Sequence, residues 1–243
     1  MNDSLTARQT QILKLIIDEY INTAEPVGSE ALEKKHNLGV SPATIRNEMV
    51  ALTVLGYLRQ PHTSAGRIPS PKAMKFYVNQ LMEEKQMSLT DEVKAKEEVW
   101  DVRDDIDELF KEATHALAAR TRSLAVGAIE DENKLWHAGY SNVFSNPEFA
   151  DMNICQNLFG LLEEVSRINE IFFGRPFKTP VDVLFGEELG WAELMPVGMV
   201  TTRFKVRGKD AALGVVGPVR LSYPTIVPIL RYFGNLIQDV SGS

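Results

Sequence analysis

A short run of the sequence, SPATIRN, has the residue types that read the edges of DNA bases. An arginine can grip guanine, an asparagine can pair with adenine, and small methyl-bearing side chains can touch the thymine methyl group. Serine followed by proline is a typical helix start, so we expect these groups on the first turns of a helix. An ordinary solvated helix face would carry similar residues, and that alternative stays open at this point. The candidate DNA contacts in this run are Ser41, Ala43, Thr44, Arg46 and Asn47.

A second group of polar residues follows that helix. The sequence PHTSAGR reads as the turn of a small hairpin, with Tyr57 to Gln60 as the outgoing strand and Ile68-Pro69 as the return. Short hydroxyl, imidazole and cationic side chains on such a turn suit contacts to the phosphate backbone or entry into a minor groove. The candidate contacts on the hairpin are His62, Thr63, Ser64, Gly66 and Arg67, and the candidate phosphate contacts on an earlier helix are Lys34 and Lys35.

Several helices must position these groups. Apolar residues at helical spacing predict the first one, in LTARQTQILKLIIDEYINTAE. Thr6 can cap its start, and Pro26 lies just past its end. A short second helix is expected in GSEALEKKHN. The inward residues predicted for the first helix are Ile12, Leu15, Ile16 and Tyr20.

The third helix, SPATIRNEMVALTVLG, is predicted to bury one stripe and to end at Gly56. If Ile45, Met49 and Leu52 face the core, the candidate base contacts point away from it, with Thr44 on the flank. After the hairpin, Ser70-Pro71 repeats the serine-proline start and opens a fourth helix. Three helices, a small hairpin and a fourth helix together predict a winged helix-turn-helix.

Charge is distributed unevenly along the 243 residues, whose net charge is −7. Residues 1–82 hold 9 Lys and Arg against 7 Asp and Glu, a net of +2, so the remainder carries −9. This pattern indicates that only the first part approaches a polyanion. No signal peptide and no membrane-spanning run is found, so we expect a cytoplasmic protein without a membrane partner.

Other chemistries find little support in the sequence. The four histidines form no HxxxH or HExxH pair, and a single cysteine excludes a multi-thiolate site, so neither a metal nor another cofactor is expected. Cys155 lies on an apolar helix stripe and is expected to be buried rather than a nucleophile. LGVVGPVR lacks the lysine and the spacing of a phosphate loop, and reads as a strand ending in a Gly-Pro turn. With no catalytic residues found, no enzyme activity is expected.

The region from about Glu83 to Arg120 is charged and helical. Its apolar residues fall at alternating spacings of three and four, which favours one helix from Thr90 to Arg120 with a heptad seam. Such a helix can pack on its own domain or pair with its copy in a second subunit, and both alternatives stay open. The seam residues are Val99, Val102, Ile106, Leu109, Ala113 and Ala116.

The remainder mixes strands and helices. SLAVGAI and the stretch from Leu135 to Phe144 are expected to form a β-pair joined by DENK. Further strands are predicted in VDVLFG, PVGMVTTRFKV and AALGVVG, and helices at Pro147 to Phe173 and Tyr223 to Val240. This mixture predicts an α+β fold with an antiparallel sheet flanked by helices.

One long stretch has a specific resemblance. NLGVSPATIRNEMVALTVLGYLRQPHTSAGRIPSPKAMKFYVNQLM, from Asn37 to Met82, is similar to the recognition helix and wing of the HrcA family of heat-inducible transcription repressors. The similarity extends upstream through ILKLIIDEYINTAEPVGSEAL. It is looser in GYSNVFSNPEFADM and in ALGVVGPVRLSYPTIVPILRY.

The resemblance implies a winged-helix domain joined to a GAF-like domain, working as a homodimer on double-stranded DNA. It also implies repression of chaperone operons through an inverted-repeat operator called CIRCE, with the GroEL chaperonin helping to keep the repressor active. A dimer that reads two half-sites binds more tightly than either module alone. The resemblance implies a DNA-binding role for the residues that match the family's motif, namely Ser41, Thr44, Arg46, Asn47, His62, Thr63, Ser64, Gly66 and Arg67.

The chain departs from the family in one respect. Family members usually carry a dimerisation insert in the GAF-like domain, whereas SLAVGAIEDENKLWHAGYSNVF runs from one expected strand to the next across a four-residue turn. We therefore expect a DNA-binding domain at 1–83, a helical linker and possible dimerisation helix at 84–120, and a GAF-like domain at 121–243. The alternative function is a ligand-responsive regulator of other genes, acting through the GAF-like domain.

Overall fold

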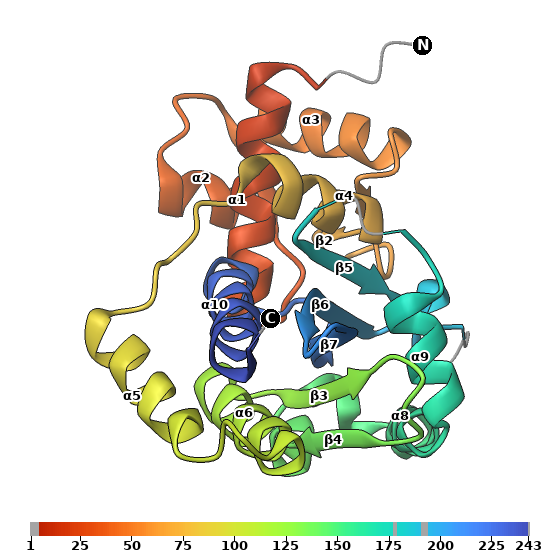
Figure 1. Ribbon diagram of the computed structural model, residues 1–243. Coiled ribbons are helices and arrows are strands. Elements are labelled where there is room, and N and C mark those ends of the chain that lie inside the picture. The colour runs from red at the N-terminus through yellow and green to blue at the C-terminus, as the bar shows by residue number, and fades with distance from the viewer. Residues whose placement is uncertain (1–4, 177–178, 191–193, 243) are drawn as a thin grey trace. The chain divides into compact units, whose positions relative to one another are not determined.

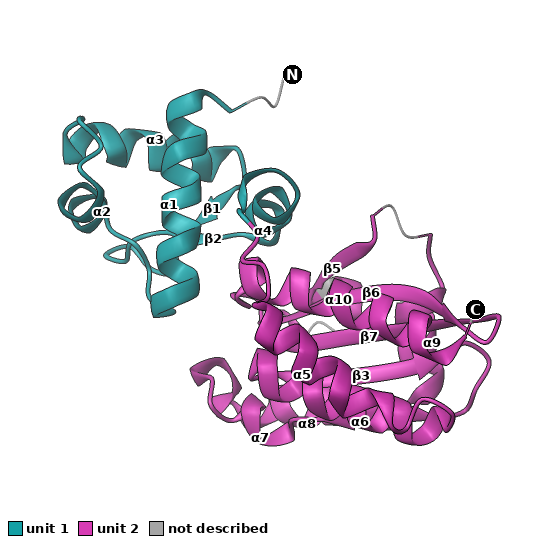
Figure 2. Cartoon of the chain, turned by 60° about the vertical axis from the view of Figure 1, so that its left-hand side comes forward, with its two compact units in different colours: residues 1–83 teal, residues 84–243 magenta. Residues whose placement is uncertain are grey.

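The computed structural model describes residues 5–176, 179–190 and 194–242. The chain divides into two compact units, residues 1–83 and residues 84–243 (Figure 2). Unit 1 denotes the first and unit 2 the second. None of the helices in the described part of the chain is both long and apolar enough to cross a bilayer.

Unit 1 is a winged helix-turn-helix. Its elements are α1 (Ala7–Thr23), α2 (Ser29–His36), α3 (Pro42–Val54), β1 (Leu58–Arg59), β2 (Ile68–Pro69), α4 (Pro71–Phe76) and a π-helical turn, η1 (Tyr77–Leu81). The two short strands pair antiparallel, with Leu58 opposite Pro69 and Arg59 opposite Ile68. The loop between them, residues 60–67, is the wing. An isolated bridge between Val27 and Arg67 ties the base of the wing to the chain ahead of α2.

The core of unit 1 forms where α1 crosses the inner face of α3. On α3 the buried residues are Ile45, Met49 and Leu52, as the sequence predicts. On α1, Ile12 and Ile16 are buried as predicted, but Leu13 and Ile17 complete the buried stripe, whereas Leu15 and Tyr20 are only half-buried. Apolar residues occupy both flanks of this stripe, so helical spacing alone did not fix which flank faces inward.

The start of α1 provides a measurable contribution to stability. Thr6 Oγ1 accepts the Gln9 N–H at 3.2 Å, and Gln9 Oε1 accepts the Thr6 N–H at 3.0 Å, which together form a capping box. We expect Thr6→Ala to lower the free energy of unfolding by about 1 kcal/mol. Denaturant unfolding of the full chain measures this loss. Thr6→Ser keeps the capping oxygen and should stay within about 0.5 kcal/mol of wild type, so an equal loss in both variants would contradict the capping role.

Unit 2 is built on a five-stranded antiparallel sheet of order β4-β3-β7-β6-β5 (Figure 1). Its strands are β3 (Leu124–Ile129), β4 (Leu135–Ala138), β5 (Val181–Phe185), β6 (Val197–Val206) and β7 (Lys209–Pro218). Its helices are α5 (Leu89–Trp100), α6 (Ile106–Thr121), α7 (Tyr140–Val143), α8 (Met152–Glu163), α9 (Val165–Phe173) and α10 (Tyr223–Ser241), with short 3₁₀ turns at η2 (Pro147–Ala150) and η3 (Gly186–Leu189).

Helices cover both faces of this sheet. On one face, α8 and α9 pack over β3, β7 and β6, and Phe172 lies so close to Gly214 that a Cβ there would approach the ring to 3.1 Å. On the other face, Phe110 of α6 packs between Trp136 and Phe204, with ring centroids 4.6 and 6.3 Å away, and α10 lies beside α6. The α+β prediction, with a winged helix-turn-helix ahead of an antiparallel sheet flanked by helices, is confirmed.

The prediction of one helix from Thr90 to Arg120 was wrong. The region holds two helices, α5 with Ser88 as its N-cap and α6 with Asp105 as its N-cap. Asp105 Oδ1 accepts the N–H groups of Asp107 and Glu108 at 2.9 and 3.3 Å, so this aspartate starts a new helix. Three of the seam residues on α6, Leu109, Ala113 and Ala116, are buried inside unit 2 and Ile106 is half-buried, so no exposed heptad seam is left there.

Two other predicted segments are shorter than expected. The strand predicted from Leu135 to Phe144 ends at Ala138, because Gly139 turns the chain with a φ of 91° and α7 follows. The helix predicted from Pro147 to Phe173 is interrupted at Glu164, which separates α8 from α9. The other strands and the last helix lie where the sequence places them.

Candidate nucleic-acid interface

The first turn of α3 is fixed by its own sequence. Ser41 Oγ accepts the Thr44 N–H at 3.2 Å and lies 3.0 Å from Thr44 Oγ1. Pro42 occupies the first turn, where its missing N–H has no helical partner to lose. The structure therefore places Ser41 and Thr44 in a capping pair, and leaves the remaining N–H groups of the first turn pointing along the helix axis.

The outward face of α3 carries the predicted base-reading residues. Ala43, Arg46 and Asn47 are exposed, on the side opposite the buried stripe of this helix. Val50 extends the same face by one turn and is 47% exposed. Sequence reasoning missed Val50, although its position one turn after Arg46 and Asn47 signals it. An exposed helix face that combines an arginine, an asparagine and small apolar groups matches the chemistry of base edges.

The wing and α3 form one cleft in unit 1. This cleft of ≈ 390 Å³ is lined by Arg46 and Met49 of α3, by the start of α2 and by the wing. The structure thus brings Arg46 together with four of the predicted wing residues, namely Thr63, Ser64, Gly66 and Arg67. His62 is at the exposed tip, where its Nδ1 lies 3.3 Å from Ser64 Oγ.

Gln60 holds the wing in shape. Its Nε2 donates to the carbonyl oxygens of Thr63 at 2.9 Å and Ala65 at 3.0 Å, so one side chain fixes two carbonyl groups of the loop. Sequence reasoning placed Gln60 only as the end of a strand. No local pattern marks it, because the two contacts depend on how the loop folds back.

We expect Gln60→Ala to weaken DNA binding by about fivefold, since the loss of wing hydrogen bonds is worth roughly 1 kcal/mol. The loop would then have to be ordered when DNA binds. Fluorescence anisotropy with a labelled duplex measures the change. Gln80→Ala removes an exposed glutamine from the end of unit 1 and serves as the matched control. Equal affinities of the two variants would contradict the role given to Gln60.

Gly66 and Arg67 form the base of the wing. A Cβ at Gly66 would lie 2.4 Å from the Val27 carbonyl oxygen, so only glycine allows this approach of two backbones. The Arg67 backbone exchanges two hydrogen bonds of 2.9 Å with Val27, and its Nε donates to Thr53 Oγ1 at 3.2 Å. The structure places Arg67 half-buried against the end of α3, so it positions the wing as well as lining the cleft.

The two lysines of α2 lie apart from this cleft. Lys34 is exposed, and Lys35 is exposed but pairs with Glu19 of α1, Nζ to Oε2, at 2.7 Å. That hydrogen bond, with another involving His36, holds the pKa of Glu19 below its ordinary value. Of the two, Lys34 is better placed to approach a phosphate, because Lys35 would have to leave its carboxylate partner.

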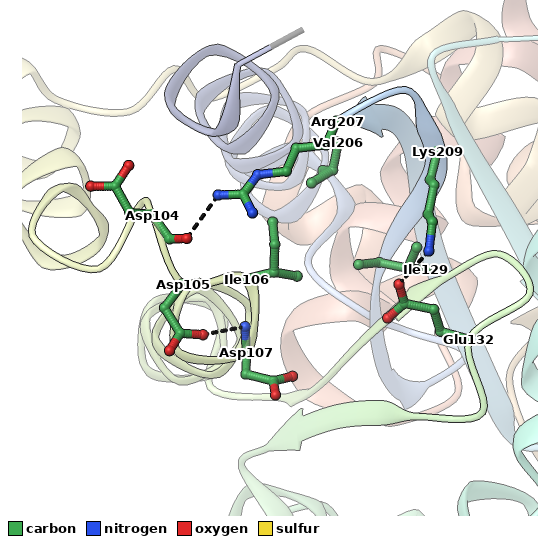
Figure 3. A pocket seen from close by; sticks show the side chains of 9 residues that line it. All are labelled: Asp104, Asp105, Ile106, Asp107, Ile129, Glu132, Val206, Arg207 and Lys209. Carbon is green, nitrogen blue, oxygen red and sulfur yellow. Dashed lines mark hydrogen bonds and ion pairs between the residues drawn. The ribbon is translucent and has the colours of Figure 1, made fainter.

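Residues of unit 2 that could support other chemistries are Cys155 and a group of charged side chains around a cavity. Cys155 is buried, its thiol lies 3.2 Å from the Phe149 carbonyl oxygen, and burial raises its pKa. Within the described residues no cluster of histidine, cysteine and carboxylate side chains could hold a metal ion. A cavity of ≈ 560 Å³ in unit 2 is lined by charged groups that bind one another (Figure 3). There Arg207 donates to the Asp104 carbonyl and Lys209 pairs with Glu132, each at 2.8 Å.

The capped third helix, its exposed polar face and the wing beside it define a winged-helix DNA-binding protein. Residues 4–83 match the family model described as "Winged helix-turn-helix transcription repressor, HrcA DNA-binding", and residues 68–227 match "HrcA protein C terminal domain". The chain belongs to the HrcA family.

Individual relatives agree with this assignment. The heat-inducible transcription repressor HrcA of Carboxydothermus hydrogenoformans is 26% identical, over 97% of this chain and 98% of its own length. The protein of the same name from Acetivibrio thermocellus is 44% identical over 128 residues, which cover 53% of this chain and 36% of the relative. A crystal structure of a hypothetical protein has the same fold, with a TM-score of 0.75, 17% identity and 98% of each chain covered.

The alignment with a relative also shows that this chain is shorter than that protein. The alignment with the Carboxydothermus protein runs over 336 positions, whereas this chain has 243 residues, so at least 93 positions (336 − 243) hold no residue of this chain. This agrees with the expected loss of an insert. Its location between β3 and β4, which are joined here by residues 130–134, stays a prediction.

Proposed function

We propose that this chain is a heat-inducible transcription repressor that binds operator DNA through the outward face of α3 and the wing. One observation carries the proposal: Arg46 on α3 and the wing residues line a single cleft, beside the exposed Ala43 and Asn47. A helix in the major groove and a loop at the adjacent backbone can then contact one stretch of duplex together. The proposal that heat relieves repression rests on the names of the relatives, which are heat-inducible transcription repressors.

The operator we propose is an inverted repeat of the CIRCE type ahead of chaperone genes, read by a homodimer. Two copies are needed because a single winged helix contacts one half-site, and joining two such modules raises the overall affinity by a large factor. GroEL is the proposed partner that keeps the repressor active, in the cytoplasm. The function consists of binding, and no catalytic step is assigned to either unit.

Transcription in a purified system tests this function. The template carries a promoter that overlaps the inverted repeat, and a second template carries a scrambled repeat of the same composition. The chain should reduce transcription from the first template only, and the reduction should be relieved by a step to heat-shock temperature. Equal transcription from both templates at every protein concentration would refute the proposed repression.

A further inference from the structure

A line of apolar side chains runs along the middle of the outward face of α3. Val50 and Val54 are exposed there, Val54 to 83%, and the exposed Ala43 lies seven residues before Val50. At 3.6 residues per turn, both valines lie within about 20° of the direction of Ala43, with Arg46 on one flank of the line and Asn47 on the other. The buried residues of α3 lie on its opposite face, so the apolar line is available to a ligand.

The one acidic residue in the sequence of α3, Glu48, is held by another helix. Its Oε2 accepts a hydrogen bond from Gln9 Nε2 at 3.2 Å, and its Oε1 lies 3.8 Å from Arg8 Nη1. Both partners belong to α1, so the carboxylate is drawn away from the outward face. That face therefore presents a cation, an amide and apolar groups to a polyanion, and its one carboxylate is already paired.

An apolar side chain can recognise one feature of the major groove. Thymine is the base that presents a methyl group there, at its C5 position, whereas the other base edges are read through hydrogen bonds. The isopropyl group of Val50 has no donor or acceptor, so a methyl group is the base feature that it can favour. Val50 lies about 4.5–6 Å further along the helix axis than Arg46 and Asn47, which exceeds the base-pair spacing of about 3.4 Å. It therefore meets a different base pair from those two residues.

We propose that Val50 reads a thymine in each half-site of the operator, by packing its methyl groups against the C5-methyl group of that base. This assignment rests on the proposed function, which brings α3 to the major groove. Val50 is assigned rather than Val54 because it lies nearer to the N-terminal part of the helix, which contacts base edges in helix-turn-helix proteins. The contact removes apolar surface from water, so it distinguishes thymine from the other bases without a hydrogen bond.

Replacement of thymine by uracil in the operator tests this contact, because it removes the methyl group and keeps every hydrogen-bonding atom of the base. Each thymine position of a CIRCE-type inverted repeat is changed in turn, in both half-sites, and fluorescence anisotropy measures the affinity of the full chain. At one position uracil should weaken binding about fourfold for each half-site, which is the effect of one buried methyl group. An apolar contact releases no counterions, so this fold-change should be the same across a salt series.

The variant Val50→Ala completes a double-mutant cycle with the uracil substitution. Alanine forms helices more readily than valine and the position is exposed, so α3 should stay folded. Val50→Ala should bind the thymine operator about fourfold more weakly per half-site than wild type, bind the scrambled duplex equally, and lose the uracil effect at the assigned position. Val93→Ala is the matched control and should keep the full uracil effect, since Val93 is a 57% exposed helical valine of α5 in unit 2.

The possible results separate the thymine contact from the proposed function. If wild type prefers the operator but no uracil position weakens it, or if every uracil effect persists in Val50→Ala, the thymine contact is overturned and repression stands. Equal weakening of operator and scrambled duplex by Val50→Ala would also overturn it, because Val50 would then act without regard to base identity. If wild type binds the operator and the scrambled duplex alike, the proposed function fails and the thymine contact fails with it.

Discussion

Arg46→Ala should remove the preference for operator DNA, lowering affinity for the operator by about 1–3 kcal/mol while leaving binding to random duplex nearly unchanged. Arg46 is exposed on the outward face of α3 and lines the cleft shared with the wing. A bidentate contact to guanine is the strongest base-specific contact that this face can make. Anisotropy titrations with operator and scrambled duplexes measure both affinities.

Lys34→Ala is the matched control for this variant. Lys34 is an exposed cation on α2 that lies outside the cleft residues, so we expect only a phosphate contact from it. Its loss should weaken operator and scrambled DNA equally and reduce the slope of affinity against salt by about one. If both variants change the two duplexes in the same way, Arg46 is not a base-reading residue.

Gly66→Ala is expected to weaken binding to every duplex and to destabilise unit 1. The new methyl group would lie 2.4 Å from the Val27 carbonyl oxygen and 2.9 Å from the Gly28 nitrogen, both of which are backbone atoms that cannot swing away. The wing must therefore move from its base, at a cost of about 1–3 kcal/mol for an overpacked site. Denaturant unfolding and anisotropy together measure the two effects.

Gly28→Ala tests whether this result is specific. Gly28 lines the same cleft, and a Cβ there meets nothing within 4 Å at a φ of −92°. Because Gly28 is the N-cap of α2, where alanine is less favourable than glycine, Gly28→Ala should lower stability by only about 0.5 kcal/mol and leave DNA affinity close to wild type. Equal losses in the two variants would show that any added methyl group at the cleft is harmful, and the close approach of Gly66 to Val27 would not be the cause.

Much of unit 1 could be predicted because its signals are local. Ser41 with Pro42, and Ser70 with Pro71, each mark a helix start through their own chemistry, and both helices begin there. The hairpin was predicted from a polar turn between two short apolar segments. Lys35 and Arg67 are candidate residues whose side chains are held by partners distant in sequence, Glu19 and Thr53, and local patterns could not predict those contacts.

Unit 2 shows where sequence patterns fail. The alternating spacing of three and four residues between apolar positions continues across residues 101–105. This spacing therefore gives no indication that one helix ends there and another begins. What breaks the helix is the capping aspartate Asp105, one of several acidic residues in a charged stretch.

The most direct test of DNA recognition is fluorescence anisotropy of the full chain with a CIRCE-type inverted repeat and with a scrambled duplex, across a salt series. Phosphate contacts weaken as salt rises whatever the sequence, whereas base contacts set the ratio between two duplexes of equal charge. We predict a large preference for the inverted repeat that persists at high salt. Equal binding to both duplexes, falling steeply together as salt increases, would contradict sequence-specific recognition by α3.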